Sequence, residues 1–269
     1  MARVLAISNQ KGGVGKTTTS VNLAACLAAD GKRTLLIDLD PQGNASSGLG
    51  VDKSNLERTI YDVIVRGVPL QDTYQRTVID GLTVVPANTD LVGAELELTS
   101  ALAREHRLSD AVADVHEDFD YILIDCPPSL GLLTLNALTA ATSVLIPLQS
   151  EYYALEGLGE LTRTISLIQK RLNPGLLWEG VVLTLYDGRN RLAQQVGEDV
   201  REHLGDKVFE TIIPRNVRLG EAPSFGEPIL TYDPRAKGAI AYRALARELL
   251  ARHGDVVSND FSHTTQRTA

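Results

Sequence analysis

The stretch "SNQKGGVGKTTT", residues 8–19, combines closely spaced glycines with two lysines and a run of threonines. It follows "VLAIS" (4–8), an apolar run typical of a buried strand, and it precedes a helix that we expect over residues 16–29. In a strand–loop–helix unit of this kind, backbone N–H groups converge on phosphate oxygens and the helix dipole strengthens the attraction. The stretch therefore predicts a phosphate-binding loop, whose residues are Gly12, Gly13, Val14, Gly15, Lys16, Thr17 and Thr18.

The two lysines of this loop need separate explanations. In the pattern G-x-x-x-x-G-K-[ST], the lysine binds the β- and γ-phosphates and the hydroxyl binds Mg²⁺, roles that fall here to Lys16 and Thr17. The pattern asks for glycine at position 10, where this chain has Gln10, so the match is to a variant, x-K-G-G-x-G-K-T. A glycine-rich turn with solvated lysines is the alternative, and the order of strand, loop and helix disfavours it. Neither interpretation explains Lys11.

Short apolar runs alternate with longer amphipathic stretches along the chain, a pattern typical of a doubly wound α/β fold. We expect a mostly parallel sheet with helices on both faces, because the strands are almost continuously Val, Ile and Leu. One domain is expected over residues 1–253, and the polar tail 254–269 is expected to be disordered. The expected strands are 4–8, 34–38, 82–86, 121–125, 143–147, 180–185 and 208–214, and the expected helices are 16–29, 94–116, 131–141, 154–172, 190–204 and 236–252.

Composition limits the classes of function. The 269 residues are 43% hydrophobic and 22% charged, and the net charge of −8 argues against a protein that coats nucleic acid over its whole surface. The charge is uneven, since residues 1–185 carry 14 Lys and Arg against 22 Asp and Glu, whereas residues 186–252 carry 11 against 10. Two distant cysteines suit a reducing cytoplasm. We expect no signal peptide and no membrane span, because no stretch reaches 18 apolar residues.

Three aspartates end two of the expected strands. Asp38 and Asp40 follow "LLI" on one side of the chain, and Asp125 ends "YILID" (121–125). Open α/β sheets bind ligands at the carboxyl ends of their strands, so these side chains are candidates to support Mg²⁺ and to orient the attacking water. Strand-end aspartates also cap turns, and the nearby phosphate loop favours the functional interpretation. We assign Thr17 and Asp125 to the metal and Lys16 to catalysis, and expect one of Asp38 and Asp40 to support the metal and the other to orient water.

The loop also carries a family resemblance. "KGGVGKTT" resembles the deviant Walker A loop of the ParA/MinD superfamily of P-loop ATPases, and "DCPPSLG" (125–131) is similar to that family's switch II. The resemblance implies ATP and Mg²⁺ as ligands. It implies that Lys11 crosses an ATP-sandwich homodimer to the partner's nucleotide, and that Asp40 is the hydrolytic aspartate of switch I. The resemblance thus implies Asp38 for the metal, and Lys11 and Asp40 for catalysis. It also places adenine on a Pro-x-Asn turn, here Pro214 and Asn216.

The C-terminal third narrows the resemblance. "RNVRLGEAPSFGEPILTYDPRAKGA" (215–239) is similar to chromosome-partitioning ParA proteins of the Soj type. That implies a patch that binds double-stranded DNA without sequence preference, with Arg189 and Arg218 in family positions and Arg215 and Arg247 as further candidates. Scattered arginines are otherwise ordinary solvated surface. The resemblance also implies a ParB-type centromere-binding protein as partner, and a nucleoid-associated, cytoplasmic location.

Three alternatives remain open. A septum-site regulator of the MinD type needs a C-terminal amphipathic membrane helix, whose spacing the tail lacks. A metabolic P-loop enzyme that activates a small substrate would turn over without DNA. A nucleotide-switched scaffold would show negligible hydrolysis. We expect slow hydrolysis by this chain alone, because no arginine is evidently placed to reach the γ-phosphate.

Overall fold

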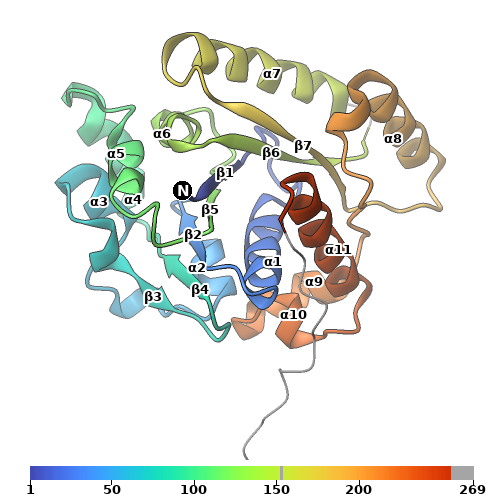
Figure 1. Cartoon of the computed structure of the whole chain (residues 1–269), viewed down its shortest axis with the longest axis horizontal. Coiled ribbons are helices and arrows are strands. Elements are labelled where there is room, and N and C mark those ends of the chain that lie inside the picture. The colour runs from blue at the N-terminus through green and yellow to red at the C-terminus, as the bar shows by residue number, and fades with distance from the viewer. Residues whose placement is uncertain (152–153, 256–269) are drawn as a thin grey trace, which may run out of the picture.

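The central feature of the computed structural model, which describes residues 1–151 and 154–255, is a twisted sheet (Figure 1). Within these residues seven strands follow the order β3-β4-β2-β5-β1-β6-β7, and all neighbours pair in parallel except β3 with β4. The expected doubly wound α/β fold is confirmed. The expectation of a disordered tail over 254–269 falls almost wholly outside the described residues.

The element boundaries agree with the sequence for most long elements. The strands are β1 (Arg3–Ile7), β2 (Thr34–Asp38), β3 (Gln75–Arg76), β4 (Leu82–Val85), β5 (Tyr121–Asp125), β6 (Ser143–Gln149) and β7 (Leu177–Thr184). The helices are α1 (Lys16–Ala29), α2 (Asn44–Gly48), α3 (Ile60–Arg66), α4 (Leu91–Glu97), α5 (Arg107–Ala113), α6 (Leu132–Ala140), α7 (Ala154–Arg171), α8 (Arg191–Leu204), α9 (Val217–Glu221), α10 (Ile229–Tyr232) and α11 (Lys237–Arg252).

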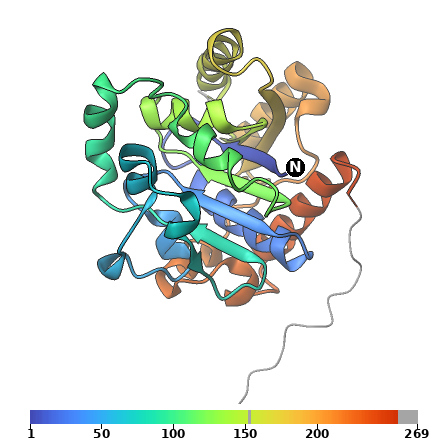
Figure 2. The same cartoon turned by 60° about the vertical axis from the view of Figure 1, so that its left-hand side comes forward.

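Two hydrophobic cores sandwich the sheet because successive strand residues point to opposite faces. In β2, Leu35 and Ile37 face a core built with α3 to α8, whereas Leu36 faces a core built with α1 and α11. In the turned view of Figure 2, the teal and green helices and the red α11 lie on opposite sides of the strands. Both faces are therefore covered, which is why the strands read as unbroken apolar runs.

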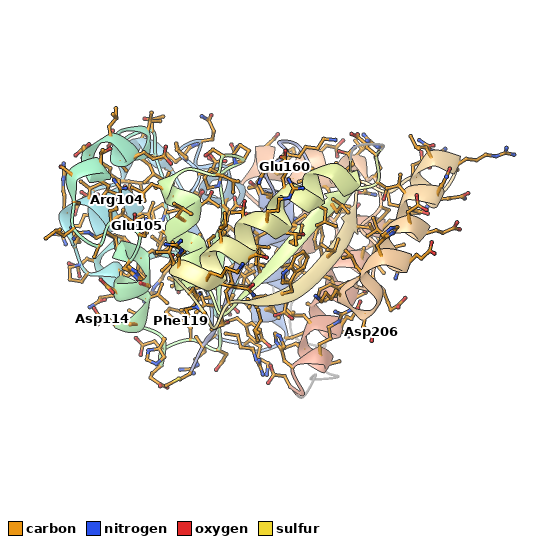
Figure 3. All side chains as sticks on the ribbon, turned by 90° about the horizontal axis from the view of Figure 1, so that it is seen from above. Arg104, Glu105, Asp114, Phe119, Glu160 and Asp206 are labelled. Carbon is orange, nitrogen blue, oxygen red and sulfur yellow. The ribbon has the colours of Figure 1, made fainter. Side chains whose placement is uncertain are left out.

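The outer surfaces of the helices carry charged side chains together with a few exposed apolar ones, such as Leu167 and Ile240. Seen from above (Figure 3), Glu160 lies on the exposed surface of α7, and Arg104 and Glu105 lie at the end of the molecule opposite Asp206. None of the helices in the described ranges is both long enough and apolar enough to cross a membrane.

The expected helix 94–116 is wrong, because the chain forms α4 and α5 with a break between them. Ala103 takes a left-handed backbone conformation with φ of 51°, which ends regular helix. Asn136 of α6 stabilises the break, since its amide donates to the carbonyl of Arg104 over 2.8 Å and accepts from the N–H of Leu108 over 3.1 Å. This tertiary contact restarts the helix at α5, and no local pattern in the sequence reveals it.

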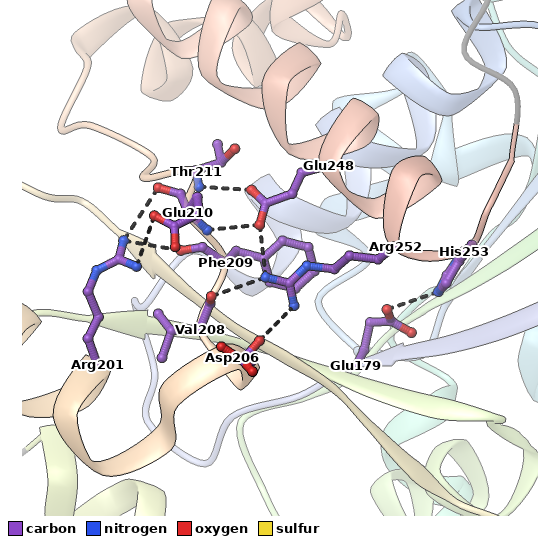
Figure 4. A network of polar contacts seen from close by, with 10 residues as sticks. All are labelled: Glu179, Arg201, Asp206, Val208, Phe209, Glu210, Thr211, Glu248, Arg252 and His253. Carbon is purple, nitrogen blue, oxygen red and sulfur yellow. Dashed lines mark hydrogen bonds and ion pairs between the residues drawn. The ribbon is translucent and has the colours of Figure 1, made fainter.

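The expected strand 208–214 is also wrong. This segment follows the edge of β7 but makes only two isolated bridges with it, Val181 with Val208 and Tyr186 with Pro214. Within the segment, the N–H groups of Phe209 and Ile213 donate to the carbonyls of Val181 and Leu183 over 2.9 and 2.8 Å. Other backbone groups of the segment bind side chains instead of a strand partner (Figure 4). The carboxylate of Glu248 on α11 accepts from the N–H groups of Glu210 and Thr211 over 2.8 and 2.9 Å.

Two arginines bind the carbonyl groups of the same segment. Arg252 donates to the carbonyls of Asp206 and Val208, and its guanidinium lies 3.9 Å from the ring centroid of Phe209. Arg201 on α8 donates to the carbonyl of Phe209 over 3.2 Å. The segment covers the edge of β7 through two backbone bonds, and side chains satisfy the groups of the segment that no further strand pairs, so the sheet ends without an open edge. The short elements α2, α3, β3, α9 and α10 were also absent from the sequence prediction.

We expect Glu248→Gln to lower the free energy of unfolding by about 1–3 kcal/mol, because it weakens two charge-assisted hydrogen bonds and the contact with Arg252. Burial by itself would raise the pKa of Glu248, but the N–H groups of Thr211 and Glu210 and the Arg252 guanidinium hold that pKa below its ordinary value. The stabilisation is therefore complete above the unfolded-state pKa of about 4.3 and is lost as the pH falls through the lower folded-state pKa.

Urea unfolding at pH 7 and at pH 3 measures this contribution. Glu210→Gln is the control, because the Glu210 carboxylate is exposed and its single contact, with Arg201, is long at 3.5 Å. Equal losses for Glu248→Gln at both pH values would contradict the assignment.

Candidate functional site

The phosphate loop lies between β1 and α1 at the carboxyl edge of the sheet. Gly13 and Gly15 have φ values of 76° and 86°, a conformation that residues with a Cβ rarely adopt. Gly15 is the N-cap residue of α1, a helix of 14 residues whose first turn carries no acidic side chain. The positive end of this helix and the loop amides therefore meet at one point, as the sequence predicts for binding phosphate.

Two side chains from outside the loop hold its backbone. Asn9 donates to the carbonyl of Pro147 over 2.8 Å and accepts from the N–H of Lys11 over 3.0 Å. Thr184, the last residue of β7, donates its hydroxyl to the carbonyl of Val14 over 2.7 Å. Because C=O and N–H point in opposite directions across a trans peptide, this bond turns the N–H of Gly15 away from Thr184.

Lys16 points back into the loop. Only 7% of the residue is exposed, and its ammonium donates to the carbonyl of Lys11 over 3.2 Å. Burial lowers the pKa of Lys16, and the nearby Asp125 and Asp40 oppose that shift. An ammonium buried beside carboxylates at the N-terminus of a helix is placed to contact a polyphosphate bound in the loop.

Lys11 points outward from the same loop. Its side chain is 43% exposed, and its ammonium pairs with Glu151, whose side chain is 48% exposed. An ion pair this exposed contributes little to stability and is readily exchanged for another partner. The structure therefore separates the two lysines, with Lys16 inside the site and Lys11 at its rim.

Asp38 and Asp125 lie side by side. They are register partners on the neighbouring strands β2 and β5, and both residues are fully buried. Asp38 accepts from the N–H and hydroxyl of Ser46 over 2.8 and 2.7 Å and from the N–H of Asp40 over 3.2 Å. Asp125 accepts from Ser20 over 2.8 Å and lies close enough to the hydroxyl of Thr17 for that group to lower its pKa, while its Oδ2 has no hydrogen-bond partner.

Burial is the main reason that the pKa values of both carboxyl groups are raised, and each group also feels a like charge nearby. A divalent cation beside the unpartnered Oδ2 of Asp125 would relieve both effects, and the Thr17 hydroxyl lies next to it. Asp38 has less free acceptor capacity, so the geometry favours Thr17 and Asp125 as metal contacts. In the described ranges, no group of three or more His, Cys, Asp or Glu could hold a metal.

Asp40 lies at the start of the loop between β2 and α2. Its side chain is partly exposed and accepts from the N–H of Gln42 over 2.9 Å. It is close enough to Lys16 and Asp125 to influence the pKa of each. The carboxylate is thus at the site but outside the buried pair, a position from which it could reach water.

The Pro-x-Asn turn lies beside the phosphate loop. Pro214 bridges to Tyr186, two residues after the Thr184 that holds Val14. The Oδ1 of Asn216 is buried and has no hydrogen-bond partner, so an amino group of a ligand base could donate to it. A separate cleft of about 390 Å³, which sequence analysis did not predict, adjoins Thr17 and Thr18 and is closed by α2 and residues 222–227.

The arginine candidates fall into two groups. The side chain of Arg189 is 92% exposed and pairs with Asp187 over 2.9 Å, and Arg215 also acts on that carboxylate. Arg218 pairs with Glu221 over 2.8 Å and lies 3.7 Å from Asp233. Arg247 lies instead near Asp30, which caps the C-terminal end of α1. Arg189 and Arg215 are therefore brought together beside the Pro-x-Asn turn, and Arg247 is not.

Several contact residues were missed from the sequence: Asn9, Ser20, Ser46, Glu151 and Thr184. Ser20 lies one helical turn after Lys16, on the side of α1 that faces Asp125, and helical periodicity could have revealed it. Thr184 is separated from Val14 by 170 residues, and only the pairing of β6 with β7 brings it to the loop.

Known proteins resemble the chain over nearly its whole length. The family described as "AAA domain" matches residues 2–177. The sporulation initiation inhibitor protein Soj of Bacillus subtilis is 57% identical over 93% of this chain and 99% of Soj. The chromosome partitioning protein ParA of Myxococcus xanthus is 57% identical over 94% of this chain and 89% of its own. A solved structure described as cobyrinic acid a,c-diamide synthase from Mycobacterium smegmatis, with bound ATP analog and magnesium, is 42% identical with a TM-score of 0.83, covering 94% and 96% of the two chains.

We expect Asp125→Asn to raise the midpoint of thermal unfolding by about 2–4 °C in EDTA, because it removes one of two buried like charges while the side-chain oxygen still accepts from Ser20. The same variant should lose the stabilisation that Mg²⁺ adds in the presence of ATP. Differential scanning calorimetry measures both effects.

The matched control is Asp40→Asn. Because the Asp40 carboxylate is partly exposed, this variant should change the midpoint in EDTA much less. A lower midpoint for Asp125→Asn in EDTA would show that the carboxylate pair does not destabilise the fold.

Proposed function

Because the chain belongs to the ParA/MinD superfamily of P-loop ATPases, and within it to the Soj-type chromosome-partitioning proteins, we propose that it is an ATPase whose nucleotide-bound dimer holds DNA during partitioning. The position of Lys11 is the main observation that supports a dimer. Its ammonium lies at the rim of the phosphate loop and pairs with the exposed Glu151. It can exchange this carboxylate for a phosphate bound to a second molecule.

The chain's own residues bind ATP in the phosphate loop. The Gly15 amide, oriented by Thr184, and the Lys16 ammonium contact the phosphates, and Asn216 accepts from the base. Thr17 and Asp125 hold Mg²⁺, which neutralises charge on the β- and γ-phosphates when it is bound. Asp40 orients the attacking water from its partly exposed position.

Dimerisation exchanges one partner of Lys11 for another. In the single chain its ammonium pairs with Glu151, and in the dimer it contacts the phosphates of the partner's ATP. Two sites lined by aspartates cannot face each other closely without cations between them, and a lysine from each chain supplies that charge. Occupancy by ATP therefore favours pairing.

DNA binding follows from pairing. Arg189, Arg215 and Arg218 each interact with carboxylates of the same chain, so one copy offers few free charges to DNA phosphates. A dimer doubles the number of phosphate contacts, and affinity rises steeply with that number. The resulting protein is nucleoid-associated, and a ParB-type partner with a basic segment stimulates its slow hydrolysis and releases it.

A metabolic P-loop enzyme is the second candidate, because the M. smegmatis structure that resembles this chain is described as a synthase. The relatives with higher sequence identity, at 57%, have partitioning or sporulation names. ATP turnover distinguishes the candidates when DNA and the partner protein are added separately and together. A partitioning ATPase is slow alone and fastest with both, whereas turnover that depends on a small substrate and ignores DNA supports the enzyme.

We expect Lys11→Ala to bind ATP with nearly unchanged affinity as a monomer and to lose ATP-dependent dimers, since the Lys11 side chain does not point into its own site. Light scattering measures the dimer and fluorescent-nucleotide titration measures the affinity. Lys170→Ala, at an exposed position of α7, is the control. Normal dimers of Lys11→Ala would refute the trans role.

We expect the double variant Arg189→Ala/Arg218→Ala to retain ATP-dependent dimers but to lose on the order of tenfold or more in DNA affinity. Its slope of log affinity against log salt should also be smaller by about one for each arginine that contacts phosphate. Arg58→Ala is the matched control, because Arg58 is also exposed and ion-paired, with Asp72 over 2.5 Å. Unchanged retention of DNA by the double variant would exclude these arginines.

A further inference from the structure

The connector from Thr184 to Tyr186 joins three parts of the molecule. Thr184 is 1% exposed, and its hydroxyl holds the carbonyl of Val14 in the phosphate loop. Two residues later, the N–H of Tyr186 donates to the carbonyl of Ile213 over 3.1 Å, and its carbonyl accepts from the N–H of Arg215 over 3.0 Å. Three consecutive residues thus link the phosphate loop, the Pro-x-Asn turn and the loop 187–190, which carries Arg189 and which we call the basic loop.

The middle residue of the connector is strained. Leu185 has φ of 51°, one of two residues other than glycine with positive φ in the described ranges. Holding a leucine in the left-handed region is unfavourable, and such residues persist only where their surroundings impose the conformation. Here the two neighbours impose it, since Thr184 is fixed to Val14 and Tyr186 to the segment 213–215.

The far end of the connector leads directly into the basic loop 187–190. The ring of Tyr186 packs beside Gly188 and Gly197, where an added Cβ would lie 3.6 Å from the ring at each position. Asp187 accepts from the side chain of Arg189 through both oxygens over 2.9 Å, and this bidentate pair lowers the pKa of Asp187 to about 2. The direction in which Arg189 points is therefore set by the backbone that follows Leu185.

We propose that the Thr184–Tyr186 connector couples occupancy of the phosphate loop to the position of the basic loop 187–190 within a single protomer. The coupling rests on the proposed function, since the basic loop matters only if it meets DNA phosphates. It differs from avidity in a dimer, because it needs no second copy. A phosphate bound to the Gly15 amide fixes the Val14 carbonyl on Thr184, and that bond holds Leu185 in its strained conformation. When the bond weakens, Leu185 relaxes and the loop after it changes direction.

The test is hydrogen exchange of residues 186–190 and 214–216, with and without Mg·ATP, in chains that also carry Lys11→Ala so that pairing does not protect the loop. Leucine and alanine both resist a positive φ. In chains with native Leu185 or with Leu185→Ala, ATP should therefore slow exchange by about fivefold or more. With Leu185→Gly, which adopts this conformation without strain, the response should be lost while the Kd for ATP changes by less than about twofold.

A second pair of variants examines the other end of the connector. Thr184→Val removes the hydroxyl and should abolish the exchange response and raise the Kd for ATP about tenfold. Thr184→Ser keeps the hydroxyl and should retain both. A full response in Leu185→Gly or in Thr184→Val, or its loss in Leu185→Ala, overturns the proposal.

DNA binding separates this proposal from the proposed function. If chains with native Lys11 retain DNA only with ATP, and the exchange response is lost in Leu185→Gly, both stand. If the exchange response persists in Leu185→Gly while retention of DNA still needs ATP, the coupling is wrong and partitioning stands. If no chain binds DNA but the exchange response follows the residue at 185 as expected, the coupling is correct and the DNA assignment is wrong.

Discussion

Two buried carboxylates in register are the constraint on which this site depends. Asp38 and Asp125 end adjacent parallel strands at the same level, so their backbones are about 4.8 Å apart. Two carboxylates at such neighbouring positions in a buried site repel each other and favour binding of a cation. Ser46 and the Asp40 amide stabilise Asp38, whereas one oxygen of Asp125 is unpartnered, facing the loop that carries Lys16 and Thr17. The site is thus electrostatically incomplete without positive charge.

The rest of the fold keeps that edge of the sheet available. Helices cover both faces, and side chains from α8 and α11 satisfy the backbone of residues 206–211, so β7 ends the sheet without a further strand. Backbone bonds from Phe209 and Ile213 hold the segment along β7, and it then places Pro214 and Asn216 beside the phosphate loop. The same arrangement brings Arg215 next to Asp187 and Arg189. The contacts of residues 206–214 thus both cover the edge of the sheet and position the Pro-x-Asn turn.

The two lysines differ in environment rather than in chemistry. Lys16 is 7% exposed and donates inward, while the Lys11 side chain is 43% exposed and pairs with a carboxylate at the rim. A buried ammonium serves the ligand of its own loop. An exposed one can change partners at little cost in free energy, since surface ion pairs contribute at most about 1 kcal/mol. This contrast supports our proposal that a single loop serves both nucleotide binding and the association of two chains.

Local sequence patterns determined the phosphate loop, α1, β2 and β5, because strand and helix periodicities and the glycine spacing act within a few residues. They also placed Asp38, Asp40 and Asp125 at strand ends, and hence at one edge of the sheet. Tertiary structure alone decided that α4 and α5 are separate, that residues 208–214 form no strand, and that Thr184 holds Val14. Each depends on side chains that lie between 28 and 170 residues from their partners in the chain, and no pattern within one element encodes contacts of that range.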